Sequence, residues 1–288
     1  MAWHRGVVIK TERDLAAMQT AGRINAQALA AAVSAVRPGV RTAEVNAAAE
    51  AVLRKHGAGM AFLGYPGPYP YPAATCISVN DELVHGIPGP RRLQEGDIVS
   101  IDCGAVVNGF VGDSAVTVGV GAISDEARRL LDVTCAALFA GIECMRLGQR
   151  TGDVSAAIQG VVEPRGFNVV REYTGHGVGR AMHEDPQVPN YGEAGSGMPL
   201  KAGMTIALEP MVLAGGPETR VLRDQWTVAS RDGRLTAHFE HTVAVTADGP
   251  RILTVLEQDL DGVPAAAYND YFVGRFPAAV REVEAKRT

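Results

Sequence analysis

The sequence is poor in cysteine. Its 288 residues include four cysteines, Cys76, Cys103, Cys135 and Cys144, and no two of them form a CxxC pair. The first ten residues, MAWHRGVVIK, also lack the apolar core of a signal peptide. Both observations favour a protein of the reducing cytoplasm.

Long apolar runs and an excess of positive charge are lacking as well. No apolar run approaches the roughly 18 residues of a membrane-spanning helix, so we expect no membrane segment. The formal net charge is -5, which favours neither nucleic acid nor an anionic membrane as a partner. A hydrophobic content of 47% is sufficient for a sizeable core in one large or two small globular domains.

Helix-capping signals occur in two pairs along the chain. They predict helices from Thr11 to the turn at residues 37–39, from Thr42 to Gly57, from Ser124 towards Gly148, and from Thr151 to about Gly166. The segments between the two pairs are strand-like and punctuated by glycine. The chain therefore repeats one order, two helices followed by several strands.

Two short segments support this repetition. LQEGDIVSID (residues 93–102) aligns with LKAGMTIALE (residues 200–209), with a leucine, a glycine and a final acidic residue in common, Asp102 on Glu209. The alignment predicts an α+β fold of two duplicated halves, each a helix pair and an antiparallel sheet, related by a pseudo-twofold axis. Both halves would then direct carboxylates towards one centre.

A hairpin brings two aspartates together. The Asn108-Gly109 pair is typical of a type I′ turn, and the register that it sets places Gly104 opposite Asp113. Because alternate residues share a face, Asp102 lies on the same face, diagonal to Asp113. On an apolar hairpin this arrangement favours a cation between them. For two such residues alone the commoner alternative is that both aspartates face solvent, so further ligands are needed to support a cation site.

Three further residues could complete a cation site. His176 stands between two glycines, whose lack of side chains lets the backbone approach its neighbours closely and leaves the imidazole free to point into a site. Glu209 and Glu240 lie in strand-like segments. Taken singly, each glutamate would more commonly be a surface charge on an edge strand. Together, four carboxylates and one imidazole suit two divalent ions with a water between them, which would hydrolyse an amide without a protein nucleophile.

Five local motifs resemble those of the type I methionine aminopeptidases. The resemblance extends over residues 9–253, and the spacings exclude the large insertion of the type II branch. The motifs are HGIP with His85, GHGVG with His176, HEDP with His183, LEP with Glu209 and FEHT with Glu240. The resemblance implies the pita-bread fold, which agrees with the duplicated halves.

The resemblance also implies roles for individual residues. His85 would contact the scissile amide, His183 would contact the substrate carbonyl or the developing oxyanion, and Glu209 would act as a general base. For a lone histidine the alternative is a hydrogen-bonded core or loop residue. The implied ligands of two divalent ions (Co, Mn, Fe or Zn) are Asp102, Asp113, His176, Glu209 and Glu240.

A methionine pocket is implied at Tyr65, Cys76, Met182 and Trp226, together with His85 and His183. Cys76 could instead be a small buried residue of its strand. The expected reaction is removal of methionine from the N-termini of nascent polypeptides, with a metal-bridging hydroxide attacking the first peptide bond. We expect a bacterial-like, cytoplasmic monomer that associates with the ribosome, without a preceding zinc-finger region.

Three features depart from the family pattern. The segment YPGPYPYPAAT (residues 65–75), here called the rim loop, is a few residues longer than usual, and Met182 stands where an aromatic residue is usual. The family pattern ends near residue 254, so we expect a catalytic domain over 1–254 and a C-terminal extension over 255–288, either a docked helix or a loose tail.

These departures leave two other functions open. The first is a pita-bread hydrolase with another substrate, such as an Xaa-Pro peptidase or a specialised peptide-tailoring enzyme. The second is a binding module that has kept the fold and lost catalysis. The complete set of predicted ligands argues against the second.

Overall fold

The computed structural model describes residues 4–256, and four α-helices lie in this range. They begin where the capping residues predict: Thr11 and Asp14 form a reciprocal capping box, and the Ser124 side chain accepts the Ala127 N–H. The helices are α1 (Glu12–Ala35), α2 (Thr42–Lys55), α3 (Asp125–Glu143) and α4 (Thr151–Val162), the last followed by a 3-10 turn at Glu163–Arg165.

The third helix is shorter than predicted. It ends at Glu143 instead of continuing towards Gly148, because the Cys144 N–H bonds back to the Gly141 carbonyl and the following residues form turns. Gly148 itself has a φ of 88°, a left-handed conformation that cannot continue a helix. The capping signal at the helix start was therefore more informative than the glycine beyond its end.

The strands of residues 4–256 form one large sheet and two small ones. Along the large sheet lie β1 (His4–Val7), β9 (Glu184–Pro189), β8 (Thr174–Gly177), β10 (Thr205–Leu208), β15 (Glu240–Thr246), β6 (Phe110–Gly119), β5 (Ile98–Val107) and β2 (Gly59–Met60), with β16 (Gly249–Ile252) on β15 and β3 (Thr75–Val79) on β5. The small sheets are β14 (Thr236–His238), β11 (Met211–Leu213) and β7 (Asn168–Val169), and β12 (Thr219–Val221), β13 (Val228–Ser230) and β4 (Glu82–Val84).

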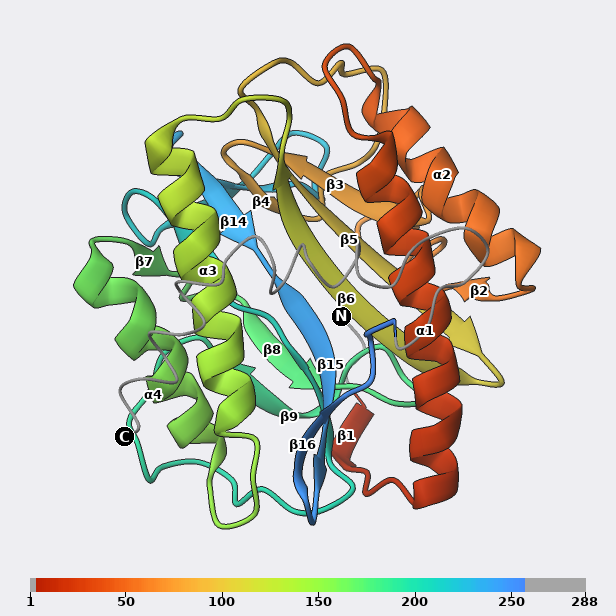
Figure 1. Cartoon of the computed structure of the whole chain (residues 1–288), viewed down its shortest axis with the longest axis vertical. Coiled ribbons are helices and arrows are strands. Elements are labelled where there is room, and N and C mark those ends of the chain that lie inside the picture. Colours follow the sequence, from red (N-terminus) through yellow and green to blue (C-terminus); the bar gives the residue numbers. More distant parts are fainter. Residues whose placement is uncertain (1–3, 257–288) are drawn as a thin grey trace.

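Both helix pairs cover the same face of the large sheet. In Figure 1, α1 and α2 lie in front of the β5 and β6 half, and α3 and α4 lie in front of the β8 and β9 half. The main hydrophobic core fills the space between these helices and the strands. The opposite face of the sheet is thereby left for the functional site.

Equivalent hydrogen bonds confirm the predicted duplication. The N–H of Gly96 donates to the carbonyl of Val120 at 2.9 Å, and the N–H of Gly203 donates to the carbonyl of Val245 at the same distance. Gly96 and Gly203 have φ values of 91° and 85°, which glycine adopts without strain. The two strands that lead to Asp102 and Glu209 therefore start from the same turn in each half. Asp102 does not close its strand as the alignment suggested, because β5 continues to Val107, whereas β10 ends at Leu208 just before Glu209.

The hairpin register also agrees with the prediction. Val107 pairs with Phe110 across the turn, Gly104 pairs with Asp113, and Asp102 pairs with Ala115. Asp102 and Asp113 consequently share one face of the hairpin. Cys103 follows Asp102 directly, so it lies on the opposite face and points into the main core. The Asn108-Gly109 turn was sufficient to place the two carboxylates side by side.

The segment that carries Glu240 is not one continuous strand. It divides at Phe239 into β14, which pairs with β11, and β15, which pairs with β10 and β6. The division lies opposite Pro210, which separates β10 from β11 and has no N–H to donate to a sheet ladder. Phe239 donates its own N–H to the Pro210 carbonyl at 3.3 Å.

Two predictions concern other parts of the chain. Within residues 4–256 no helix is long and apolar enough to cross a membrane. The predicted C-terminal extension over 255–288 lies outside the described residues except for its first two positions.

Two glycines inside helices allow a test of the packing between α1 and the sheet. A Cβ on Gly22 of α1 would overlap the Leu253 carbonyl oxygen, whereas a Cβ on Gly160 of α4 would meet open space. We expect Gly22→Ala to lower the free energy of unfolding by about 1–3 kcal/mol. As the matched control, Gly160→Ala should raise it by about 0.5–1 kcal/mol, because alanine loses less backbone entropy in a helix. Urea unfolding measures both, and equal effects would contradict the close α1 contact.

Candidate metal centre

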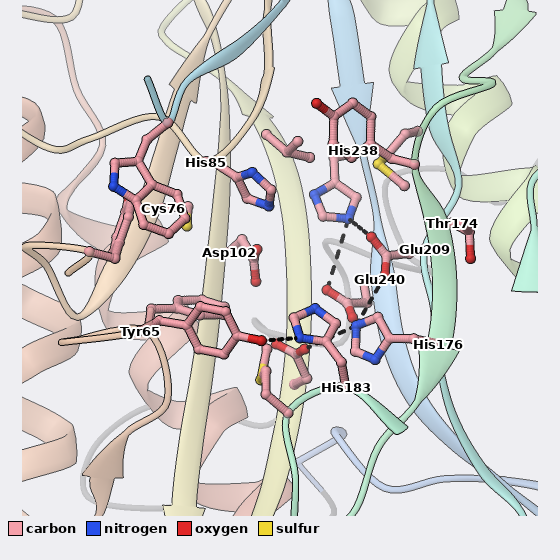
Figure 2. A pocket seen from close by; sticks show the side chains of 18 of the residues that line it. Tyr65, Cys76, His85, Asp102, Thr174, His176, His183, Glu209, His238 and Glu240 are labelled. Atoms are coloured by element: carbon pink, nitrogen blue, oxygen red, sulfur yellow. Dashed lines mark hydrogen bonds and ion pairs between the residues drawn. The ribbon is translucent and has the colours of Figure 1, made fainter. Parts of the chain in front are cut away.

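A cavity of about 300 Å³ opens on the face of the sheet away from the helices. Every residue predicted for the site lines it: Tyr65, Cys76, His85, Asp102, Asp113, His176, Met182, His183, Glu209, Trp226 and Glu240. In Figure 2, His176, Glu209 and Glu240 gather at one end, Tyr65 and Cys76 lie towards the other, and Asp102 lies between them. The cavity thus has a polar end and an apolar end.

The two aspartates supply the first half of the polar end. Asp102 and Asp113 come from the β5–β6 hairpin, and each has a buried Oδ1 without a hydrogen-bond partner among the described residues. A buried carboxylate oxygen without a donor is costly unless a cation or a bound water satisfies it. The geometry of this hairpin therefore fits a cation between the two side chains.

His176 is oriented as a ligand would be. Its Nδ1 lies 2.9 Å from the Gly177 carbonyl oxygen, which can only accept a hydrogen bond, so Nδ1 carries the proton. The unprotonated Nε2 then faces the carboxylates, at 3.3 Å from Glu209 Oε1 and 4.0 Å from Asp113 Oδ2. Metal-binding histidines are commonly fixed by such a bond from the other ring nitrogen.

The glycines beside His176 are required by close packing. A Cβ on Gly177 would overlap the Asp185 carbonyl oxygen, and a Cβ on Gly175 would come within 2.8 Å of the Ala207 carbonyl oxygen. The strand β8 is therefore pressed between its neighbours β9 and β10. This is the close backbone approach that the glycines predict.

Glu209 and Glu240 come from the second half of the fold. Glu209 follows the last residue of β10, and Glu240 is the first residue of β15. Glu240 Oε1 is buried without a hydrogen-bond partner in the described part of the chain. One ligand atom each from Asp113, His176 and Glu240 lies within 4.8 Å of the other two, which is close enough to hold one metal ion.

The electrostatics of the site favour added positive charge. Burial raises the pKa of Asp102 to about 8, and burial together with neighbouring carboxylates raises the pKa of Asp113, Glu209 and Glu240 well above the ordinary carboxyl range. Burial also lowers the pKa of His176 to about 4, so this imidazole is neutral at physiological pH. Neutral imidazole and ionised carboxylate are the states that bind a divalent ion.

The family model of metallopeptidase family M24 matches residues 16–247. The chain belongs to metallopeptidase family M24. It is a metal-dependent peptidase, and divalent metal ions are the cofactors that this family implies. The unsatisfied buried oxygens and the orientation of His176 fit that cofactor.

Similar proteins include methionine aminopeptidases and a prolidase. Methionine aminopeptidase 1 of Bacillus subtilis (strain 168) is 49% identical over 248 residues, which cover 86% of this chain and 99% of the relative. The solved methionine aminopeptidase of Thermotoga maritima is 45% identical with a TM-score of 0.84, covering 86% of this chain and 99% of that one. The prolidase of Pyrococcus furiosus is 26% identical with a TM-score of 0.70, covering 87% and 66%. These similarities confirm the pita-bread fold.

The apolar end of the cavity contains the predicted pocket residues and two that the sequence did not reveal. Cys76, Trp226, Phe62 and Tyr71 pack in one buried cluster, with Tyr65 and Met182 partly buried against it. Cys76 pairs with Asp102 across β3 and β5, so its thiol faces the cavity. Phe62 and Tyr71 were missed because they lie in irregular chain, where no periodicity indicates the direction of a side chain.

The rim loop packs onto Trp226. The Trp226 indole N–H donates to the Tyr69 carbonyl at 3.2 Å, and the Tyr69 hydroxyl donates to the Asp224 carbonyl at 2.8 Å. A Cβ on Gly67 would overlap the Trp226 ring, so the loop lies directly against it. The longer rim loop therefore forms part of the wall of the apolar pocket.

The two predicted catalytic histidines lie in different surroundings. His183 is near His176, with ring centroids 4.3 Å apart, and its Nδ1 is 2.6 Å from the Tyr65 hydroxyl. His85 has a φ of 60° and meets the Trp226 ring edge-on at a centroid distance of 6.3 Å. Both histidines thus lie between the carboxylates and the apolar wall.

His238 is a cavity residue that the sequence interpretation did not identify. It precedes Glu240 by two positions, and its Nε2 is 3.7 Å from Glu209 Oε2 and 3.9 Å from Glu240 Oε2. Alternation along a strand could have indicated that residues 238 and 240 share a face.

The raised carboxyl pKa values predict a pH-dependent stability. A carboxyl group whose pKa is higher in the folded than in the unfolded protein stabilises the fold below its unfolded value of about 4, and this contribution is lost as the pH rises through the folded value. For Asp102 that folded value is about 8. The EDTA-treated protein should therefore lose stability progressively between about pH 4 and pH 8.

Thermal unfolding with and without Mn²⁺ measures this effect. Added Mn²⁺ should offset the loss at high pH, because the ion replaces the protons, and Asp102→Asn should show a weaker pH dependence without metal. A melting temperature of the EDTA-treated protein that does not fall over this range would contradict the assignment.

Proposed function

We propose that this chain removes the N-terminal methionine from polypeptides and that two divalent metal ions serve the reaction. The observation that carries the proposal is the single cavity in which buried carboxylates and His176 adjoin an apolar pocket. An unbranched thioether side chain suits the apolar end, and the first peptide bond would then lie at the polar end. The methionine aminopeptidases among the relatives support the same substrate.

The proposed metal ligands are Asp102, Asp113, His176, Glu209 and Glu240. When bound, the ions would polarise the scissile carbonyl and lower the pKa of a bound water. Glu209, which is partly exposed at the cavity, would accept the proton of the attacking water. The metals would be Co, Mn, Fe or Zn, since carboxylate-rich sites accept each of these ions.

His183 is proposed to donate a hydrogen bond to the substrate. Burial raises the pKa of the Tyr65 hydroxyl, which therefore keeps its proton and donates it to His183 Nδ1. Burial also lowers the pKa of His183 to about 2, so the ring is neutral and carries its own proton on Nε2. A neutral N–H donor suits a substrate carbonyl or a developing oxyanion. For His85 we propose contact with the scissile amide.

The proposal includes the setting of the reaction. The substrates would be nascent chains at the ribosome, and the enzyme would be a cytoplasmic monomer. Separation of ribosomes from free protein on a sucrose gradient tests the first point.

Cleavage of three matched peptides tests the substrate. Met-Ala-Ser, Pro-Ala-Ser and Ala-Pro differ in the features that separate methionine removal from Xaa-Pro cleavage, and the Mn²⁺-loaded or Co²⁺-loaded enzyme should cleave Met-Ala-Ser far faster than the others. Failure on the methionyl peptide with cleavage of Ala-Pro would establish the prolidase-like alternative instead.

Measurement of bound metal tests the binding-module alternative. His176→Ala should lose stoichiometric metal, and a protein without stoichiometric metal in its unaltered form would be a binding module.

Removal of the Tyr65 hydroxyl tests the role of His183. Tyr65→Phe keeps the aromatic wall and removes the proton that fixes the His183 tautomer, so kcat should fall about tenfold while KM and metal content change little. Tyr69→Phe is the matched control, since its hydroxyl bonds to the Asp224 carbonyl outside the polar end. A Tyr65→Phe enzyme with unchanged kcat, or with a raised KM alone, would show that the hydroxyl does not act through His183.

A further inference from the structure

His238 points at the metal centre without belonging to the predicted ligand set. Its side chain is 2% exposed, and Nε2 is buried without a hydrogen-bond partner among the described residues. Figure 2 shows this nitrogen between the carboxylates of Glu209 and Glu240, with dashed lines to both. A buried imidazole nitrogen in this position is costly unless it serves these carboxylates.

The duplication of the fold explains why a functional side chain occurs at this position. Val120 and Val245 are equivalent, because each accepts the N–H of the equivalent glycine. Seven residues before them along the chain stand Asp113 and His238. His238 therefore occupies in the second half the position that Asp113 occupies in the first.

Two threonine hydroxyls confirm the equivalence of Asp113 and His238, because each is hydrogen-bonded to both the backbone N–H and the backbone carbonyl of one of these residues. The Thr242 hydroxyl accepts the Asp113 N–H at 3.0 Å and donates to the Asp113 carbonyl at 2.8 Å. In the same way, the Thr117 hydroxyl accepts the His238 N–H and donates to the His238 carbonyl, both at 2.8 Å. Both threonines stand three residues before the equivalent valines, so the pseudo-twofold axis relates the two pairs of hydrogen bonds.

The sheet ladder is interrupted where Glu209 and Glu240 stand. Glu209 precedes Pro210, which cannot donate to the ladder, and Glu240 follows the division between β14 and β15. Glu209 therefore lies outside the strand pairing and Glu240 lies at its end, paired with Ala115, whereas Asp102 and Asp113 lie inside a continuous ladder. His238 lies beside this interruption. Its backbone N–H and its backbone carbonyl are both hydrogen-bonded to the Thr117 hydroxyl.

We propose that His238 is a positioning residue of the metal centre, which holds Glu209 and Glu240 by an N–H at Nε2. Nε2 lies 3.7 Å from Glu209 Oε2 and 3.9 Å from Glu240 Oε2, and both distances are longer than that of a hydrogen bond. A small rotation of either carboxylate would bring its oxygen within hydrogen-bond distance of Nε2. Carboxylates only accept hydrogen bonds, so the imidazole is the donor. The inference rests on the proposed function, because it assigns Glu209 and Glu240 to the metal ions.

Metal titration tests the inference without measuring activity. The EDTA-treated protein is titrated with Mn²⁺ in a calorimeter, and the Co²⁺ form is followed by its visible absorption. Because supporting bonds to ligands are worth about 10–100-fold in metal affinity, His238→Leu and His238→Ala should weaken Mn²⁺ binding by about that factor. His238→Gln, which keeps a side-chain N–H at the position of Nε2, should restore most of the affinity and the Co²⁺ spectrum.

His241→Gln is the matched control. His241 is also buried and adjoins Glu240, but its Nδ1 bonds to the Thr254 hydroxyl at 2.8 Å and it does not line the cavity. Its replacement should leave Mn²⁺ affinity within about twofold of the unaltered protein, far less than the loss of a supporting bond. Thermal unfolding of each EDTA-treated variant shows which ones are folded before titration.

Two outcomes would overturn the inference. The first is unchanged Mn²⁺ affinity in a folded His238→Leu or His238→Ala protein. The second is binding by His238→Gln as weak as by those variants, because the ring and not the N–H would then be required. If the unaltered protein binds two ions but does not cleave Met-Ala-Ser, the proposed substrate fails while the role of His238 is still measured.

Discussion

The burial of four carboxylates in one cavity is the constraint on which the rest of the structure depends. Desolvation alone raises the pKa of Asp102 to about 8, and the other three are raised by burial and by one another. Such a cluster is tolerable only where cations or protons neutralise it. The rigid sheet behind it, covered by two helix pairs, keeps these side chains together despite their mutual repulsion.

Duplication is the means by which a simple fold assembles this cluster. Each half supplies a strand that starts from a glycine turn and leads to an acidic residue, Asp102 within β5 or Glu209 just after β10. The halves meet where Ala115 on β6 pairs with Glu240 on β15, so the acidic residues of both halves converge on the same place. The two halves depart from symmetry at Pro210 and Phe239, where the second half divides its strand into β14, which pairs with β11, and β15, which pairs with β10.

The sequence predicted the parts of the site that local rules determine. The Asn108-Gly109 turn fixed the register of Asp102 and Asp113, and the glycines around His176 correctly indicated close packing. The division at Phe239 was not foreseen, because it arises from Pro210 on a neighbouring strand and not from the segment itself. The Tyr65–His183 contact joins residues 118 positions apart in irregular chain, where neither periodicity nor turn chemistry applies.

Reaction and specificity are determined by different parts of the molecule. Asp102, Asp113 and His176 sit on strands whose positions are fixed by the ladder, so this part of the metal centre follows from the fold itself. The apolar wall is built from Phe62, Tyr71 and Trp226, and the rim loop is fastened to that wall through the Trp226 indole. A change in this loop would alter the wall while the strands that carry Asp102 and Asp113 stay in place, because surface loops vary on a constant scaffold, and both a methionine aminopeptidase and a prolidase are similar to this chain in fold.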